Sequence, residues 1–592
     1  MSTPTVGIAG AGVAVEAATA ALADAETAEV DAREFAGVDL GVVVDDAGAE
    51  TFERANSAAR EGETPWLAVE LGGVGGRPLP EVEAAVSGFA PATACYECLR
   101  TRVEANLDDG SDADDGDGDE ATPGTDAPTA RLAGALAGRE AATLLSGGES
   151  AILGGVIEVP HAERRVLPVP DCGVCGDARD RTLARDHAES TLEESLARAE
   201  RAVDDRVGLV SSIGEAESFP APYYLAELAD TTGFSDARAA EQAAGVAADW
   251  NEGLMKALGE ALERYAAGVY RESEFRVARP ADVDSAVAPA EFVRPGDAGA
   301  AQSGDWAAPA PDEAVAWVRG ADLATGDSVD LPAEFVHFPP PEVRHRPSIT
   351  TGLGLGNSTV EALLSGLYEA VERDATMLAW YSTFEPLGLS VDSERFETLS
   401  RRARAENLDV TAMLVTQDVD VPVVAVAVHR DREEWPAFAV GSDADLDPDA
   451  AAESALAEAL QNWMELRSMG REDAADSDGA IGRYAGFPES AREFVSVETT
   501  VPSDSVGPAE VPEGTAELDA VLDRLADADL SAFAARLTTR DVASLGFEAV
   551  RVLVPDAQPL FTGTAYFGER ARTVPAELGF EFRPDRELHP YP

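Results

Sequence analysis

The sequence writes the pattern Glu-Ala-x-Glu-Arg twice, about a hundred residues apart, and then an altered copy, Glu-Ala-Leu-Gln. On a helix, residues three or four positions apart share a face, so each copy would present its polar groups to one side. Carboxylates gathered from several helices repel one another at low dielectric, and Mg²⁺, which prefers oxygen ligands, relieves that repulsion. An Arg beside them suits a phosphate oxygen. The residues concerned are Glu260, Glu263, Arg264, Glu369, Glu372, Arg373, Glu458 and Gln461.

These groups would form a carboxylate and guanidinium pocket for Mg-nucleotide without a Walker loop, and the sequence contains no G-x-x-x-x-G-K-[ST] motif. The alternative is that each copy is a solvated helix face with intrahelical ion pairs. Spacing alone favours that alternative. The glycine-rich segment T-T-G-L-G-L-G-N-S at 350–358, which precedes the second copy, favours the pocket instead.

The four cysteines form two C-x-x-C pairs with none left over, Cys95 with Cys98 and Cys172 with Cys175. Two such turns can supply the four thiolates of a tetrahedral zinc site, which would then be closed and structural. A redox dithiol or an iron–sulphur cluster are alternatives, but each would need a reason for the second pair. The compartment disfavours a cytosolic disulfide.

The charge balance excludes several classes of protein. The chain has 110 Asp and Glu against 45 Lys and Arg, a formal net charge of -65 that is spread along its length. This composition resembles the solvating surface of a halophile's cytosolic protein and would repel nucleic acid phosphates. No apolar run approaches about 18 residues and the N-terminus lacks a charged segment, so we expect no membrane span, no signal peptide and a cytoplasmic location.

A length of 592 residues predicts two or three domains. Residues 1–180 are predicted to form a small α/β domain, in which a strand passes through a glycine turn at Gly10 and Gly12 into an Ala-rich helix. Val15 occupies the third-glycine position of a dinucleotide fingerprint, which favours a bare scaffold over a nucleotide site. The acidic segment at about 108–128 is typical of a disordered insertion.

Residues 186–592 alternate amphipathic helices with strands, which predicts a second, larger α/β or α+β domain. The segments A-L-G-E-A-L-E-R-Y, T-G-L-G-L-G-N-S-T-V-E-A-L-L-S-G-L-Y-E-A-V-E-R-D-A, A-L-A-E-A-L-Q, V-L-V-P-D-A-Q-P-L-F and a terminal H-P-Y-P follow in the order of the YcaO family, which this region resembles. The N-terminal part, with its cysteine tetrad, looks like the ThiF-like partner domain of azoline-forming YcaO proteins.

The resemblance implies that the eight residues of the three copies bind ATP and Mg²⁺. It also implies that the C-terminal tail, ending at Pro592, enters the site and helps to move a proton. Two positions depart from the family: Lys256 stands where a Ser is usual, and Leu588 replaces the first proline of a P-x-P-x-P tail. Because no helix or strand is predicted at 590–592, we expect deletion of these residues to affect stability little.

The implied activity is that of a cyclodehydratase. A Cys, Ser or Thr side chain of a ribosomally made precursor peptide attacks the preceding amide, whose oxygen leaves as phosphate at the expense of ATP, and an azoline ring remains. A flavin dehydrogenase and a homodimer are expected partners. Thioamide formation, assistance to a methylthiotransferase, and a non-catalytic peptide-binding scaffold are the rival functions. A winged-helix module for a leader peptide is not evident in the first 90 residues.

Overall fold

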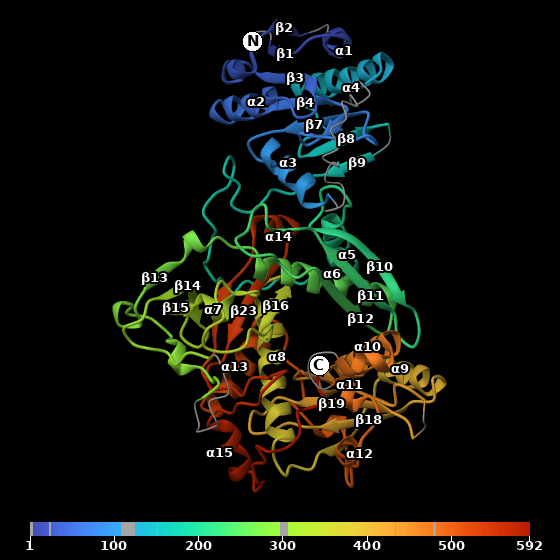
Figure 1. Ribbon diagram of the computed structural model, residues 1–592, viewed down its shortest axis with the longest axis vertical. Helices are drawn as coiled ribbons and strands as arrows, with labels where there is room; N and C mark the ends of the chain where they lie inside the picture. The colour runs from blue at the N-terminus through green and yellow to red at the C-terminus, as the bar shows by residue number, and fades with distance from the viewer. Residues whose placement is uncertain are drawn as a thin grey trace.

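The computed structural model describes residues 4–22, 25–107, 125–150, 152–160, 162–296, 306–431, 434–476 and 481–592. An N-terminal module stands above a larger C-terminal part in Figure 1. The predicted insertion lies outside the described residues except for residues 125–128. There the expectation is wrong, because Asp126 accepts a hydrogen bond from the Thr129 N–H at 2.7 Å and caps helix α4 (Ala127–Leu145).

The N-terminal module is a seven-stranded sheet in the order β2-β1-β3-β4-β7-β8-β9. Strands β1 to β4 run parallel, and the last three strands add to the sheet antiparallel. Helices α1 and α4 pack on one face, whereas α2 and α3 pack on the other. The elements are β1 (Thr5–Ala9), α1 (Val13–Ala21), β2 (Glu26–Glu29), β3 (Leu40–Asp46), α2 (Glu50–Glu61), β4 (Trp66–Leu71), the short hairpin β5 (Gly73–Val74) and β6 (Arg77–Pro78), β7 (Ala84–Phe89), α3 (Tyr96–Ala105), α4, β8 (Gly155–Val159) and β9 (Ala162–Arg165).

The glycine turn after β1 has a packing reason. Gly10 has a φ of +129°, and a Cβ built on it would lie 2.3 Å from the Val44 carbonyl oxygen of β3. Only glycine allows the turn to approach the neighbouring strand this closely. This contact accounts for Gly10 without a bound nucleotide, in agreement with the scaffold interpretation.

The C-terminal part contains three sheets among its described residues. Their orders are β10-β11-β12, then β13-β14-β22-β23-β16 with β15 paired to β14, and β20-β19-β18-β17-β21. The strands are β10 (Val210–Glu217), β11 (Tyr223–Leu228), β12 (Gln242–Val246), β13 (Arg276–Ala278), β14 (Val315–Asp322), β15 (Ser328–Pro332), β16 (Leu353–Gly356), β17 (Leu387–Ser390), β18 (Asp409–Leu414), β19 (Val423–His429), β20 (Phe438–Ala444), β21 (Thr500–Pro502), β22 (Phe533–Arg536) and β23 (Glu548–Leu553).

The helices of this part are α5 (Leu192–Ala199), α6 (Trp250–Gly268), α7 (Ala333–Val336), α8 (Thr359–Trp380), α9 (Glu394–Ala405), α10 (Pro448–Asp476), α11 (Ile481–Tyr484), α12 (Glu489–Phe494), α13 (Thr515–Asp527), α14 (Arg540–Leu545) and α15 (Arg570–Glu577). Helix α5 is shorter than the long amphipathic helix expected from residue 190, because the chain tightens into a 3-10 turn at Glu200–Ala202.

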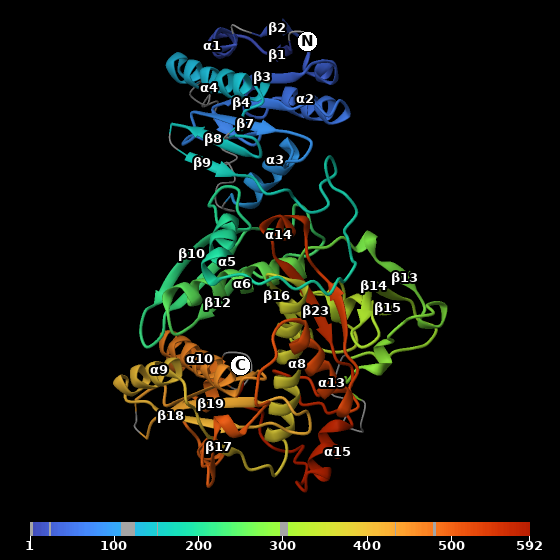
Figure 2. The same ribbon diagram turned by 180° about the vertical axis from the view of Figure 1, so that it is seen from behind.

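Helix α8 forms the centre of the C-terminal part. It begins at the cap Ser358, packs against β16 and β23 on one side, and meets β19 and β20 on the other (Figures 1 and 2). Its apolar residues, such as Leu363, Leu367 and Trp380, are fully buried. Each such side chain contributes about 1.5–3 kcal/mol by leaving water, so the position of α8 is strongly fixed.

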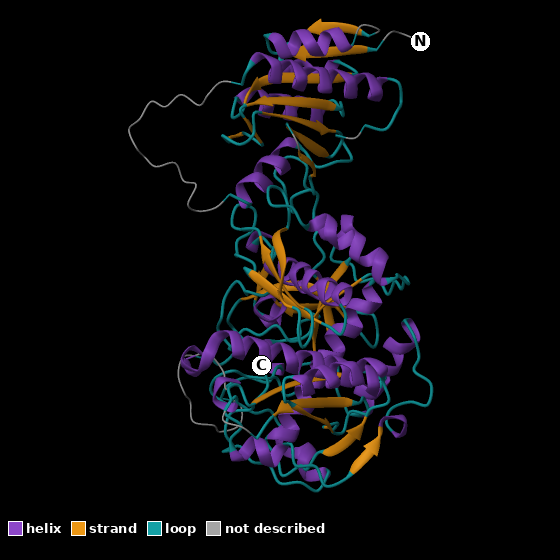
Figure 3. Cartoon of the chain, turned by 90° about the vertical axis from the view of Figure 1, so that its right-hand side faces the viewer, coloured by secondary structure: helices purple, strands orange, loops and turns teal. Residues whose placement is uncertain are grey.

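Figure 3 shows the two parts from the side, with the N-terminal sheet at the far end from the C-terminus. Within the described ranges, no helix has both the length and the apolar character needed to span a bilayer.

Candidate functional site

Each copy of the glutamate pattern lies on a helix that directly follows an edge strand. Strands β12, β16 and β20 each stand at the end of their own sheet, and α6, α8 and α10 carry the three copies. Charges on the three helices act on one another. The Glu369 charge of α8 affects the pKa of Glu263 on α6, and the charges of Glu369 and Arg373 affect the pKa of Glu458 on α10. The structure therefore brings the predicted residues together at the junction of three sheets.

The first glutamate of each copy is held by the backbone of the preceding strand or, for Glu369, of the residue directly before that strand. In every case one carboxylate oxygen accepts a hydrogen bond from a backbone N–H at the strand edge, where a neighbouring strand would otherwise pair. The bonds are from Ala244 to Glu260 at 2.9 Å, from Gly352 to Glu369 at 2.9 Å, and from Ser442 to Glu458 at 2.7 Å. One oxygen is thus fixed in direction, which positions the carboxylate for a ligand on its other side.

Three glycines allow the helices to lie against these strands. A Cβ built on Gly245 would lie 2.1 Å from the Ala257 nitrogen of α6, one on Gly354 would lie 2.2 Å from the Ala362 oxygen of α8, and one on Gly441 would lie 2.5 Å from the Ala455 oxygen of α10. In every case the added Cβ would overlap backbone atoms of the helix, so no side chain larger than hydrogen fits without moving the helix.

The arginines of the first two copies lie among the carboxylates. Arg264 pairs with Glu260 at 3.1 Å, and Arg373 pairs with Glu372 at 3.4 Å. The Nη1 atom of Arg373 makes that 3.4 Å contact and the Nη1 atom of Arg264 lies 3.9 Å from Glu263, but neither buried atom forms a hydrogen bond with a described residue. Buried donors of this kind require an acceptor, and phosphate oxygens are suited to guanidinium groups. The residues present therefore fit a bound nucleotide.

The negative charge of the clustered glutamates exceeds the positive charge of the arginines among them. Burial raises the pKa of Glu263 to about 7, with Glu369 adding to the rise and Arg264 opposing it. Burial also raises the pKa values of Glu372 and Glu458. A divalent cation would remove this penalty by stabilising the ionised forms, which is the electrostatic condition for a Mg²⁺ site.

Gln461 takes part through a residue that sequence analysis missed. Its Nε2 atom donates to a Glu465 carboxylate oxygen at 2.9 Å, and the Tyr223 hydroxyl of β11 donates to the same oxygen at 2.9 Å. This arrangement ties α10 to the first sheet beside Glu458.

Lys256 faces the carboxylate cluster from α6. Its charge opposes the effect of burial on Asp443, whose pKa is raised to about 7. Lys256 also lines a hollow of about 320 Å³ between α6, α9 and α10, together with Leu192, Ala247, Arg395 and Ala457. The substitution for the usual Ser therefore adds a cation to the site instead of disrupting it.

The C-terminal tail is packed against the same cluster. Trp380 Nε1 donates to the Glu587 carbonyl at 2.9 Å, the Tyr484 hydroxyl donates to the Leu588 carbonyl at 2.7 Å, and the Tyr591 side chain is 2% exposed. Burial raises the pKa of Tyr591, and the Glu372 charge adds to the rise. The expectation that deleting 590–592 costs little stability is wrong, because Tyr591 belongs to the core around α8.

The four cysteines meet at one point, as predicted. The sulphur atoms of Cys95 and Cys172 are 3.8 Å apart and those of Cys98 and Cys175 are 3.4 Å apart, and all four lie within 4.8 Å of one another. Tetrahedral zinc with Zn–S bonds of about 2.3 Å requires sulphur separations of about 3.8 Å. The tetrad fits a zinc ion.

The cysteine centre is connected to α6 through a buried polar chain. Arg540 donates to the Cys175 carbonyl at 2.8 Å and lies 3.5 Å from its sulphur, while Asp541 pairs with Arg102 of α3 and accepts from the Tyr265 hydroxyl at 2.6 Å. Arg102 and Asp541 are fully buried. Tyr265 follows Arg264 directly in the sequence.

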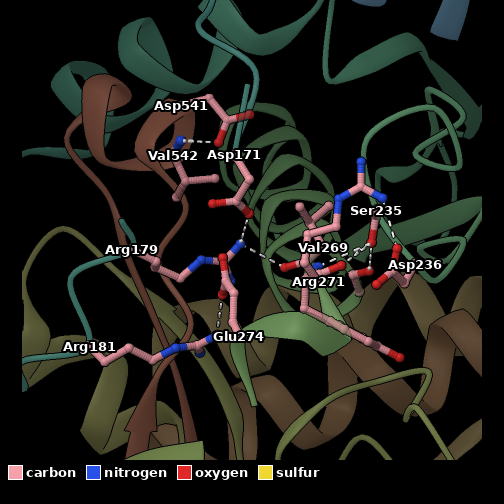
Figure 4. A network of polar contacts seen from close by, with 12 residues as sticks. Asp171, Arg179, Arg181, Ser235, Asp236, Val269, Arg271, Glu274, Asp541 and Val542 are labelled. Atoms are coloured by element: carbon pink, nitrogen blue, oxygen red, sulfur yellow. Dashed lines mark hydrogen bonds and ion pairs between the residues drawn. The ribbon is translucent and has the colours of Figure 1, made fainter. Parts of the chain in front are cut away.

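Figure 4 shows the neighbouring segment that leaves the second cysteine pair. Arg179 donates to the Val269 carbonyl at the end of α6 at 2.9 Å, and Arg181 pairs with Glu274 at 3.4 Å. The N-terminal module is therefore attached to the helix that carries the first glutamate copy.

Comparison with known proteins agrees with this geometry. Residues 244–558 match the model of the family described as YcaO cyclodehydratase, ATP- and Mg²⁺-binding. The chain belongs to the YcaO family. An uncharacterised protein of Methanothermobacter thermautotrophicus is 28% identical over 347 residues, which is 56% of this chain and 85% of the relative. A protein encoded in the tfuA 3′ region of Rhizobium leguminosarum bv. trifolii is 28% identical over 221 residues, or 34% of this chain and 52% of that protein.

Two solved structures share the fold of this YcaO protein along its whole length. A heterocyclase in complex with substrate and cofactor has a TM-score of 0.74 at 20% identity, and the heterocyclase TruD has a TM-score of 0.68 at 19% identity. The alignments cover 100% of this chain and 85% and 84% of the two structures. The predicted α/β class is confirmed, together with the family.

Proposed function

We propose that this YcaO protein is an ATP- and Mg²⁺-dependent cyclodehydratase that forms azolines from Cys, Ser or Thr residues of a ribosomally made precursor peptide. The observation that carries the proposal is the convergence of α6, α8 and α10, each with a glutamate fixed by its own strand edge. Family membership supports the ATP and Mg²⁺ chemistry.

The polar groups of the site are assigned roles in this reaction. The eight residues of the three copies bind the nucleotide and Mg²⁺, and the hollow beside Lys256 has room for the nucleoside. The peptide thiol or hydroxyl loses its proton and attacks the preceding amide carbon, and the amide oxygen accepts the terminal phosphoryl group of ATP with release of ADP. The C–O bond to phosphate then breaks while the amide N–H proton is lost to solvent, which leaves the C=N bond of the azoline ring. Hydrogen-bond donors with fixed positions, such as Arg264 and Arg373, stabilise the negative charge on the phosphoryl oxygens in the transition state.

The tail supplies the proton-transfer group in this proposal. Tyr591 anchors the chain end beside Glu372 and Arg373, and Pro592 itself is exposed. We assign to Pro592 the role that the family resemblance implies, which is to help move the proton of the attacking side chain. This role would not require Pro592 to contribute to the core.

The cysteine tetrad is proposed to hold one structural zinc ion, with residues 1–180 as the ThiF-like partner domain and 186–592 as the catalytic domain. Four protein thiolates complete the coordination and leave no position for substrate. The remaining predictions rest on composition and resemblance. They are bacteriocin-type precursor peptides as substrates, a flavin dehydrogenase that oxidises the azolines, a homodimer, a cytoplasmic location and a halophilic source.

The test compares ring formation by the full chain with ring formation by a variant that lacks only Pro592. The same assay distinguishes the enzyme from a non-catalytic peptide-binding scaffold. Synthetic peptides with Cys after a flexible residue are incubated with Mg²⁺ and ATP, and mass spectrometry measures the loss of one water for each ring. We expect product from the full chain only, with unchanged ATP affinity and thermal stability in the deletion. Equal product from both would refute the tail role, and no peptide-dependent ATP turnover in either would favour the scaffold.

A further inference from the structure

A small cavity beside the nucleotide residues is lined by two arginines and no acid. Among the described residues, its wall includes Arg346, Arg373, Ile349, Thr351 and Gln558, and its volume is about 30 Å³. That volume exceeds the roughly 10–15 Å³ that one water needs. The chain has 110 acidic residues and 45 basic ones, yet only cationic and neutral side chains line this cavity.

Arg346 has no carboxylate partner. It is 8% exposed and forms no ion pair within 4.0 Å in the described parts of the chain, although the Glu334 charge still acts on it. Its guanidinium lies over the Phe335 ring at 4.3 Å and the Phe292 ring at 5.5 Å. A cation–π contact contributes up to about 2 kcal/mol, whereas removing a charge from water costs several kcal/mol. The rings therefore offset only part of the cost.

A second buried guanidinium, that of Arg551, is close enough for the Arg346 charge to act on it. Arg551 of β23 is 2% exposed and donates to the carbonyls of Ile349 and Thr350, in the loop that lines the cavity, at 2.9 and 2.8 Å. Its Nε atom has no hydrogen-bond partner within the described ranges. Burial lowers the pKa of Arg551 to about 9, and the Arg346 charge adds to this effect, whereas the charges of Glu369 and Glu263 oppose it. An anion between the two guanidinium groups would reduce their mutual repulsion.

The cavity shares Arg373 with the candidate nucleotide site. Arg373 pairs with Glu372 and also lines the cavity, so an anion in the cavity would contact a residue of the candidate nucleotide site. From this arrangement we propose that Arg346, supported by Arg551 and Arg373, forms a binding site for a tetrahedral phosphate dianion. The assignment rests on the proposed function for its place in the reaction, where it holds the terminal phosphoryl group of the nucleotide or the phosphate that leaves the ring carbon.

The test uses the lack of an ion-pair partner for Arg346 among the described residues. Arg346→Met replaces a buried charge that has no ion pair within 4.0 Å in the described parts of the chain by an apolar side chain that can lie on the same rings. In phosphate-free chloride buffer this variant should therefore unfold at the wild-type temperature or above. Arg430→Met is the matched control. Arg430 is 7% exposed and lies 5.7 Å from the Trp463 ring, but it pairs with Glu434 and donates to the Trp435 carbonyl. This control should unfold at a lower temperature than wild type.

Inorganic phosphate at matched ionic strength is the probe. It should raise the unfolding temperature of wild type and of Arg430→Met, and the phosphate dissociation constant should rise at least about tenfold in Arg346→Met, as expected for loss of a charged hydrogen bond. The proposal is overturned if Arg346→Met is destabilised as much as the control in chloride, if phosphate stabilises wild type and Arg346→Met equally, or if phosphate leaves wild type unchanged.

A second arm separates the two sources of phosphate. If the cavity holds the terminal phosphoryl group, saturating Mg²⁺ and AMP-PNP will abolish the effect of phosphate, and Arg346→Met will weaken AMP-PNP binding but not ADP binding. If it holds free phosphate, the two stabilising effects will add. The phosphate measurements contain neither peptide nor ATP, so they stand even if peptide-dependent turnover, and with it the proposed function, fails.

Discussion

Replacing Gly245 with Ala should disable the nucleotide site without touching any polar group in it. The new Cβ would lie 2.1 Å from the Ala257 nitrogen and 2.6 Å from the Gly253 oxygen, both in the backbone of α6. To restore a contact of 3.4 Å, the helix would have to move by about 1.3 Å. Overpacking of this kind costs about 1–3 kcal/mol of stability.

The functional effect should be larger than the effect on stability. Glu260, Glu263 and Arg264 all move with α6, and a displacement of about 1 Å in catalytic groups costs roughly a hundredfold in rate. The matched control is Gly214→Ala in the same three-stranded sheet, where a Cβ would meet nothing within 4 Å. The assays are calorimetric titration with Mg·AMP-PNP and peptide-dependent ATP turnover. Wild-type affinity and turnover in Gly245→Ala would refute the view that close strand–helix packing positions these groups.

Three further predictions concern charge and metal. Because burial raises the pKa of Glu263 to about 7, the metal-free folded state keeps a proton that the unfolded state releases near pH 4.5. The stability from this carboxyl is thus complete below pH 4.5 and is lost as the pH rises to about 7; Glu263→Gln should flatten that part of the unfolding-temperature profile, and an unchanged profile would contradict the assignment. Asp541→Ala leaves Arg102 buried without its carboxylate partner, so the free energy of unfolding in urea should fall by about 3–5 kcal/mol. The control Glu50→Ala, in the exposed pair with Arg54, should lower it by about 0.5 kcal/mol or less. Similar losses in the two variants would be evidence against the buried connection. Metal analysis should find one zinc per chain whose chelation lowers the unfolding temperature, whereas an iron–sulphur absorption band would exclude the zinc assignment.

The local parts of the site could be predicted from the sequence, since helical spacing places Glu260, Glu263 and Arg264 on one face and C-x-x-C spacing pairs the thiols. The strand-edge contacts could not be predicted, because Ala244, Gly352 and Ser442 act through their backbone N–H groups. Arg346 and Arg551 were missed for a similar reason: Arg346 lies in the loop before β16 and Arg551 lies in β23, and neither belongs to one of the three repeated patterns. That both line or border one cavity depends on contacts between distant segments, such as the bonds from Arg551 to Ile349 and Thr350. The burial of Tyr591 depends on long-range packing against α8.

The central claim is that glutamates from three helices form one Mg-nucleotide site. Mg·AMP-PNP binding should be measured by calorimetry for Glu260→Gln, Glu369→Gln and Glu458→Gln, with the exposed α9 residue Glu397→Gln as the control. Each of the first three variants should weaken binding at least about tenfold, because each loses an anionic oxygen from a shared site, and the control should bind as wild type does. Wild-type affinity in all three would show that the repeated glutamates are helix-face residues with no role in binding.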